Sequence, residues 1–88
     1  MRVPEICRFL GIWIYMYWQD HGPPHFHAKY GAFRAKVRIA PVTLMAGRLP
    51  PRALALIVEW ASRYEAELLA NWARCERKEP PVRIPPLE

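Results

Sequence analysis

The sequence predicts an α+β domain in which a three- to four-stranded antiparallel sheet packs on a long C-terminal helix, either straight or kinked. Two patterns support this fold class. Residues 25–39 alternate polar and apolar side chains about a glycine turn, which is typical of a β-hairpin. Residues 51–78 repeat apolar side chains every three or four positions, which is typical of an amphipathic helix. We therefore expect a single domain over residues 1–88, with the sheet in 6–47, the helix in 51–78 and a proline-rich tail in 79–88.

The composition is that of a small folded protein with a basic surface. Of the 88 residues, 52% are hydrophobic and 12% are aromatic, a content that excludes a disordered chain. Thirteen Lys and Arg against eight Asp and Glu give a net charge of +5, which favours anionic partners such as RNA or DNA. A chain of this length buries only about 60–65% of its unfolded surface, so a homodimer interface would add to a small core.

The two cysteines, Cys7 and Cys75, lie far apart and outside any Cys-x-x-Cys pattern. They predict buried core residues rather than a disulfide framework or a zinc ribbon. The apolar run over residues 7–18 contains Arg8, lacks a small-residue cleavage site and is too short to span a bilayer. We therefore expect a cytoplasmic protein.

An aromatic and β-branched run from Phe9 to Trp18 predicts the first strand. Alternation gives this strand an aliphatic face and an aromatic face. The aliphatic face comprises Ile12, Ile14 and Met16, and the aromatic face comprises Trp13, Tyr15 and Tyr17. Two interpretations stay open: a central strand covered on both faces, or an aromatic platform on which nucleic-acid bases stack.

The next two strands, His25–Tyr30 and Phe33–Ile39, are predicted to form a hairpin through a type II′ turn at Gly31-Ala32. The resulting register separates apolar from polar pairs. The apolar pairs are Tyr30 with Phe33, Ala28 with Ala35 and Phe26 with Val37; the polar pairs are Lys29 with Arg34, His27 with Lys36 and His25 with Arg38. We therefore expect the imidazoles and the cations to share an open surface.

A short fourth strand is expected at Val42–Ala46, followed by a helix over Pro51–Lys78 whose first turn suits Pro51. A straight helix of that length would measure about 42 Å, whereas a compact domain of this size has a diameter of about 31 Å. The helix must therefore bend or protrude. The capping-box pattern at Ser62–Glu65 makes a break near Ser62 the alternative.

The histidine-rich stretch Trp18–Tyr30 holds all three histidines of the chain. His21, His25 and His27 are candidate ligands of a divalent metal ion, with Asp20 as a fourth ligand or as a partner of one. The same histidines are alternatively candidate catalytic residues, two of them cleaving RNA as acid and base while Asp20 or Tyr30 orients an imidazole. A third interpretation gives them a structural or partner-binding role, and the spacing does not decide among the three.

The cationic face raises an electrostatic question, because Lys29 and Arg34 repel each other as direct cross-strand neighbours. One answer is a nearby carboxylate such as Asp20. The other is a phosphate group bound across Lys29, Arg34, Lys36 and Arg38. With Tyr15 and Tyr17 as stacking partners, these cations predict a nucleic-acid site.

The chain resembles a small bacterial family known as domain of unknown function 4160. The likeness is carried by Asp20-His21-x-Pro23-Pro24-His25-Phe26-His27-Ala28 and by matching residues along nearly the whole chain. Members are often encoded beside another small protein, as in a toxin–antitoxin pair, so the resemblance implies a cognate small-protein partner. It supplies no catalytic residues. After Ala35 this chain departs from the family pattern, because Arg38 stands where members tend to have an acidic residue.

The leading functional hypothesis is a toxin–antitoxin-like module that binds RNA or DNA through the basic sheet face, with RNA cleavage by the histidines as a further step. The alternative is a non-catalytic interaction protein that binds a cognate small protein or a second copy of itself. The residues leave open whether the protein is an enzyme.

Overall fold

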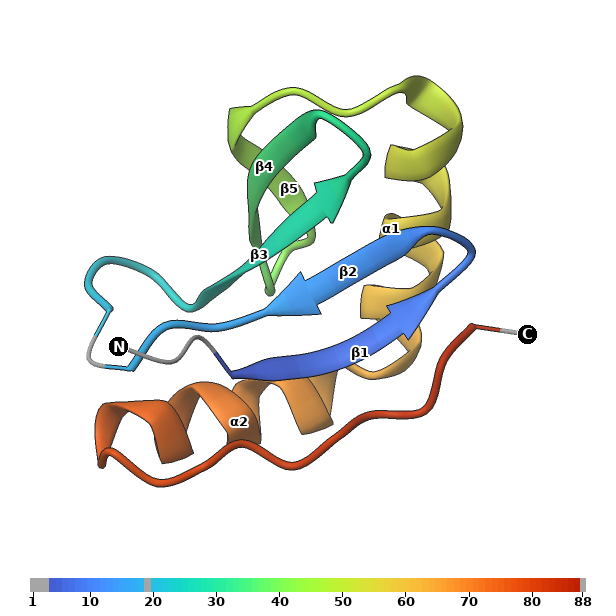
Figure 1. Ribbon diagram of the computed structural model, residues 1–88. Helices are drawn as coiled ribbons and strands as arrows, with labels where there is room; N and C mark the ends of the chain where they lie inside the picture. The colour runs from blue at the N-terminus through green and yellow to red at the C-terminus, as the bar shows by residue number, and fades with distance from the viewer. Residues whose placement is uncertain (1–3, 19, 88) are drawn as a thin grey trace.

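In the computed structural model, which describes residues 4–18 and 20–87, an antiparallel sheet packs on two C-terminal helices (Figure 1). The described residues form five strands, which lie in the sheet in sequence order. These are β1 (Glu5–Phe9), β2 (Ile12–Tyr15), β3 (His25–Tyr30), β4 (Phe33–Arg38) and β5 (Thr43–Gly47). The helices are α1 (Pro51–Arg63), behind the sheet in Figure 1, and α2 (Glu65–Glu76), below β1. Predictions that fall on residues 1–3, 19 and 88 lie outside the described residues.

The α+β class is confirmed, but the single strand predicted over Phe9–Trp18 is wrong. The chain reverses at Leu10-Gly11, so that Phe9 pairs with Ile12 and β1 and β2 form a hairpin. Leu10 and Gly11 take φ values of 49° and 81°, and positive φ at both central positions is typical of a type I′ turn. A leucine rarely adopts this conformation, so the sequence reads as one continuous apolar run. The described part of the sheet therefore has five strands rather than three or four.

The predicted register of the β3–β4 hairpin is confirmed at every one of its six residue pairs. Gly31 takes φ 58° at the first turn position, as a type II′ turn requires. Phe26, Ala28 and Val37 are buried in the core, as their face predicted. The short strand predicted at Val42–Ala46 is present as β5, displaced by one residue.

The single helix predicted over Pro51–Lys78 is also wrong, because the helix is interrupted at Tyr64. This residue takes φ −112° and ψ 31°, outside the helical range. It still donates its N–H to the carbonyl of Trp60 at 3.1 Å and accepts from the N–H of Leu68 at 2.9 Å, so the chain bends without losing these bonds. The bend keeps both helices over a molecule that measures only 33 × 23 × 23 Å. The predicted capping box is not used, since neither helix has a side-chain cap at its N-terminus.

Trp60 lies at the centre of the core between the sheet and α1. Its ring is fully buried and lies 5.6 Å from the ring of Phe9 and 5.8 Å from that of Phe26. Its indole N–H donates to the carbonyl oxygen of Pro85 at 2.8 Å. Cys7 and Cys75 are free and buried, as predicted.

The proline-rich tail packs on the molecule and runs back along α2 (Figure 1). Asn71 of α2 binds both main-chain polar groups of Val82: its amide donates to the carbonyl of Val82 and its oxygen accepts from the N–H of the same residue, each at 2.8 Å. Further on, the N–H of Ile84 donates to the carbonyl of Ile6 in β1 at 2.9 Å. The tail thereby joins α2 to the first strand.

Neither α1 nor α2, the helices of the described residues, has the length and apolar character that crossing a membrane requires.

Candidate functional site

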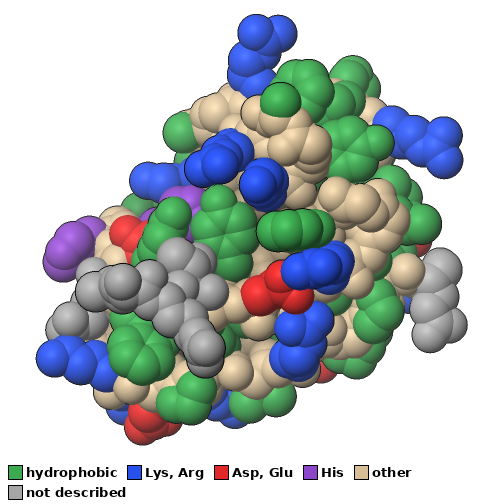
Figure 2. Space-filling view, viewed as in Figure 1, with side chains coloured by type: hydrophobic (Ala, Val, Ile, Leu, Met, Phe, Trp, Pro, Cys, Tyr) green, Lys and Arg blue, Asp and Glu red, His purple; other side chains and the backbone are tan. Residues whose placement is uncertain are grey.

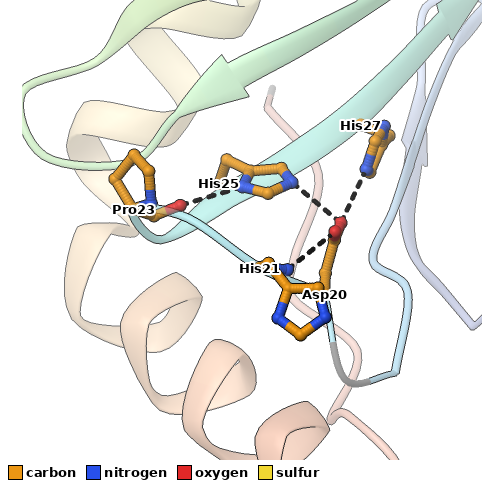
Figure 3. Close-up of polar contacts among 5 residues, drawn as sticks. All are labelled: Asp20, His21, Pro23, His25 and His27. Atoms are coloured by element: carbon orange, nitrogen blue, oxygen red, sulfur yellow. Dashed lines mark hydrogen bonds and ion pairs between the residues drawn. The ribbon is translucent and has the colours of Figure 1, made fainter.

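One aspartate and two histidines meet where β3 begins (Figure 3). Oδ2 of Asp20 lies 2.8 Å from Nε2 of His25 and 3.2 Å from Nε2 of His27. Alternation along β3 gives the two histidines the same side of the strand, whereas Asp20 comes from the β2–β3 loop. Pro23 and Pro24 stiffen this loop because each ring fixes its own φ. The three side chains are therefore brought together by one short segment of chain.

His25 is buried, with 1% of its surface exposed, against the ring of Trp72 in α2 at 4.9 Å. Its Nδ1 lies 2.8 Å from the carbonyl oxygen of Pro23 (Figure 3). A carbonyl oxygen can only accept, so Nδ1 carries the hydrogen of this bond. Nε2 in turn faces the Asp20 carboxylate. The expectation that His25 is open to solvent is wrong, because α2 covers it.

His27 is half-buried between two tyrosines. Tyr15 stacks on it with a ring separation of 5.5 Å and an interplanar angle of 16°, and Tyr17 meets it edge-on at 4.5 Å. Burial lowers the pKa of His27, and electrostatic interaction with His25 and Lys36 lowers it further, whereas the hydrogen bond and charge of Asp20 act in the opposite direction. The pKa of His27 therefore lies below its usual value, which favours the neutral imidazole at pH 7.

Asp20 is held as an ionised carboxylate. Burial acts to raise its pKa, but hydrogen bonds from His27, from the main-chain N–H of His21 and from His25 outweigh it, so the pKa lies below the usual range. The His21 N–H donates to Oδ1 at 2.9 Å, which leaves Oδ2 directed at the two imidazoles (Figure 3).

The structure brings together three of the four residues predicted as catalytic or metal-binding. Asp20, His25 and His27 each offer a donor atom within 4.8 Å of the others. His21 takes part through its main chain, and its side chain is exposed. Tyr30, the other group predicted to orient an imidazole, instead packs against the hydrophobic core. Of the two residues predicted to orient an imidazole, Asp20 is therefore the one that contacts the histidines.

The sequence analysis did not predict two contacts of the site, which are those of Tyr15 with His27 and of Trp72 with His25. The stacking of Tyr15 on His27 follows from the β2–β3 register, which pairs these residues directly. That register depends on the β1–β2 turn, which the sequence did not reveal. Trp72 reaches His25 only through the packing of α2, for which the local sequence carries no signal.

A second group of predicted residues lies on the uncovered side of the sheet, called here the open face. Cross-strand pairing places Trp13 beside Lys29 and Arg34 in one row, and Tyr15 beside His27 and Lys36 in the next. Arg38 follows at the end of β4, opposite His25. Figure 2 shows Lys and Arg side chains interspersed with hydrophobic ones over the strands.

The open face is hollowed beside β2. The hollow has a volume of about 300 Å³ and is lined by Glu5, Trp13, Tyr15, Tyr17, Lys29 and Arg34. Trp13 and Tyr17 are 40% and 38% exposed. Within the single chain the aromatic side of β2 therefore faces solvent, and the interpretation of this side as packed against the rest of the same chain is wrong.

Trp13 contacts two cations of the open face, and one of them is Lys29, which repels Arg34. Nζ of Lys29 lies 5.2 Å from the centre of the indole ring, and Cζ of Arg8 lies 4.1 Å from it. Such cation–π contacts contribute about 0.5–1 kcal/mol each at exposed sites. Asp20, named in the sequence as a carboxylate that could offset the repulsion between Lys29 and Arg34, instead pairs with His25 and His27 among the described residues.

Glu5 is the acidic residue that borders the hollow. Its carboxylate accepts from Arg8 at 2.7 Å and from Arg83 of the tail at 3.2 Å. The hydrogen bond from Arg8 lowers the pKa of Glu5 most, Arg83 adds to this, and burial acts in the opposite direction. The carboxylate is therefore neutralised by two guanidinium groups.

Acidification is expected to destabilise the protein through Glu5. Its folded-state pKa is lowered, so its contribution to stability is fully present above the unfolded value of about 4.3 and is lost as the pH falls through the folded value. The melting temperature of a Glu5→Gln variant should therefore fall less steeply than that of the wild type below about pH 4.3. Thermal denaturation followed by circular dichroism measures this, and parallel curves for the two proteins would contradict it.

Comparison with known proteins identifies a family. Residues 11–73 match the family model described as Domain of unknown function (DUF4160), a range that includes Asp20, His25, His27 and the β2–β4 part of the open face. No curated protein and no solved structure matches the chain.

Proposed function

Since the chain belongs to the DUF4160 family, whose function is unknown, we propose from its open face that it binds single-stranded nucleic acid. The observation that carries the proposal is the hollow beside β2, in which exposed aromatic rings and cations line one uncovered sheet surface. This combination is typical of proteins that bind single strands, because bases stack on the rings while the cations contact the phosphates.

The aromatic part of the proposal rests on Trp13 and Tyr17. Both rings are more than a third exposed beside the same hollow, and Tyr15 between them is fixed by its stacking on His27. Base stacking on such rings contributes about 1–3 kcal/mol per base. Only unpaired bases present their faces in this way, which favours a single strand over a duplex.

The electrostatic part rests on the cations of β3 and β4. Lys29 and Arg34 border the hollow, and Lys36 lies in the neighbouring row. The acidic residue in the hollow, Glu5, is already paired with Arg8 and Arg83, so it opposes a phosphate less than a free carboxylate would. The net charge of +5 acts in the same direction at longer range.

Fluorescence anisotropy with short labelled RNA and DNA strands tests the proposal. We expect salt-dependent binding by the wild type and a loss of about tenfold or more in the Lys29→Ala/Arg34→Ala double variant. Two lost phosphate contacts should also reduce the slope of log affinity against log salt by about 1.4, since each contact on a single strand contributes about 0.7.

The matched control removes the same two charges from α1 through Arg52→Ala/Arg63→Ala. Both arginines are exposed on the helix, away from the hollow. An equal loss of affinity in this control would show that net charge alone attracts the strand, and absence of binding by the wild type would refute the proposal.

RNA cleavage by His21, His25 or His27, a toxin–antitoxin role and a cognate small-protein partner stay predictions. The same oligonucleotides test cleavage, because fragments that appear with the wild type and not with a His27→Ala variant would add catalysis to binding. Intact strands would leave a binding module.

The second candidate function, a non-catalytic interaction module, is favoured by the edge strand β5. All five of its residues are exposed, none is charged, and Leu44 and Met45 are apolar. Charge-free edges of this kind pair readily with another strand, and a second copy of the chain would supply one. A dimeric mass by light scattering, together with no binding of oligonucleotides, would favour this candidate over the first.

A further inference from the structure

We propose that Asp20, His25 and His27 form a binding site for a first-row divalent transition-metal ion, with Zn²⁺ as the natural probe. The site is distinct from the hollow of the open face, and the inference does not depend on nucleic-acid binding. It rests on the convergence of three donor atoms, on the hydrogen bonds that orient them and on the chemistry of the donor set.

The donor atoms are spaced as ligands of one ion. With bonds of about 2.0–2.1 Å, as found for Zn²⁺, neighbouring ligand atoms lie about 2.9–3.4 Å apart. Oδ2 of Asp20 lies 2.8 Å from Nε2 of His25 and 3.2 Å from Nε2 of His27. All three atoms fall within 4.8 Å of one another, so only small side-chain movements are needed to surround an ion.

Hydrogen bonds outside the cluster already set the ligands in the required form. The Nδ1–H of His25 donates to the carbonyl of Pro23, which leaves Nε2 as the coordinating nitrogen. The main-chain N–H of His21 donates to Oδ1 of Asp20, which leaves Oδ2 for the ion. Ligating histidines and carboxylates in metalloproteins are usually held by such partners.

The surroundings keep the rings in place. His25 lies against Trp72, and His27 lies between Tyr15 and Tyr17. The side chains of His25 and His27 are 1% and 16% exposed, so few alternative rotamers are open to them. Asp20, at 24%, is the most accessible of the three and gives the ion a route from solvent.

The donor set selects the class of ion. Two imidazoles and one carboxylate suit Zn²⁺, Fe²⁺, Co²⁺ or Ni²⁺, whereas Mg²⁺ and Ca²⁺ prefer oxygen ligands throughout. The carboxylate charge offsets part of the charge of the ion. The positive charges of Lys36 and Arg38 oppose the binding of a cation, because these residues lie directly across the β3–β4 hairpin from His27 and His25. Three protein ligands also leave at least one position for water, unlike a closed four-ligand zinc site.

Metal titration of the tag-free full-length chain, pretreated with a chelator, tests the inference. Calorimetry with Zn²⁺ and visible absorption with Co²⁺ should each show one ion per chain. Removal of one ligand should weaken binding by about tenfold or more, a loss of the size that even a partner of a ligand causes. We expect this loss in His27→Ala and Asp20→Asn, and a matching loss of the visible Co²⁺ bands.

His21→Ala is the matched control, because it removes the neighbouring imidazole while its main-chain N–H still donates to Asp20. This variant should bind Zn²⁺ as the wild type does. Circular dichroism confirms that each variant is folded, and the partly exposed His27 is preferred to the buried His25 for this reason. A wild type that takes up neither ion, a His27→Ala variant that binds normally, or an equal loss in His21→Ala would each overturn the proposal.

Discussion

Replacing Trp60 by alanine is expected to lower the free energy of unfolding by about 3–5 kcal/mol, the usual range for the loss of a buried tryptophan. The ring is fully buried, contacts Phe9 of β1 and Phe26 of β3, and lies 6.2 Å from the ring of Tyr64 at the helix break. One side chain thus holds two hairpins of the sheet against α1. Its removal leaves a cavity that the surrounding strands can fill only in part.

This loss is large for a chain of 88 residues, since domains have a stability of about 0.05–0.15 kcal/mol per residue. Urea denaturation followed by fluorescence or circular dichroism measures it. Trp60→Phe is the matched control: it keeps most of the volume but removes the N–H that donates to Pro85, so we expect a loss of about 1 kcal/mol. Equal midpoints for the alanine variant and the wild type would show that the core does not depend on this ring.

Replacing Asn71 by alanine is expected to detach the C-terminal tail and to cost about 1–3 kcal/mol. The substitution removes both hydrogen bonds to Val82 and the bond that Arg74 donates to the Asn71 oxygen. Asn71 is 1% exposed, so these bonds are shielded from water on the helix side. Limited proteolysis should cut the tail of the variant earlier than that of the wild type.

Asn71→Asp separates the two halves of this interaction. The aspartate still accepts from the N–H of Val82 and from Arg74, but it no longer donates to the Val82 carbonyl. We therefore expect proteolysis at an intermediate rate. If the alanine variant is as resistant as the wild type, the tail is held by Ile84 and Leu87 instead, both of which are buried.

The parts of the fold that the sequence predicted are those encoded by a local pattern. The β3–β4 register follows from alternation on either side of Gly31, and both ingredients lie within a few residues of each other. The β1–β2 turn was missed because Leu10 adopts a backbone conformation that its side chain disfavours. The break at Tyr64 was missed by the prediction of one helix, and the alternative break near Ser62 lies two residues too early, because no side-chain cap marks the break.

In the candidate site, too, the features set by a local pattern were predicted and those set by the packing of distant elements were not. Asp20, His25 and His27 were predicted together with His21, and they converge because a short, proline-stiffened loop and a strand with a period of two leave them little choice of direction. The side chain of His21 is exposed instead. The burial of His25 could not be predicted in this way. It depends on Trp72, which comes from α2 at the far end of the chain and reaches the site only after both helices have packed.

The bond between Ile84 and Ile6 has a consequence for assembly. β1 and β5 are the two edge strands of the described sheet. The tail occupies part of the outer edge of β1, so the edge at β5 is the more open of the two. A molecule with one open sheet edge can pair with a second copy about a twofold axis, and such a dimer has no further open edge to which another strand could be added. By binding β1 at Ile6, the tail leaves the described sheet with one fully open edge rather than two, and fewer open edges lower the tendency of a sheet to extend into fibres.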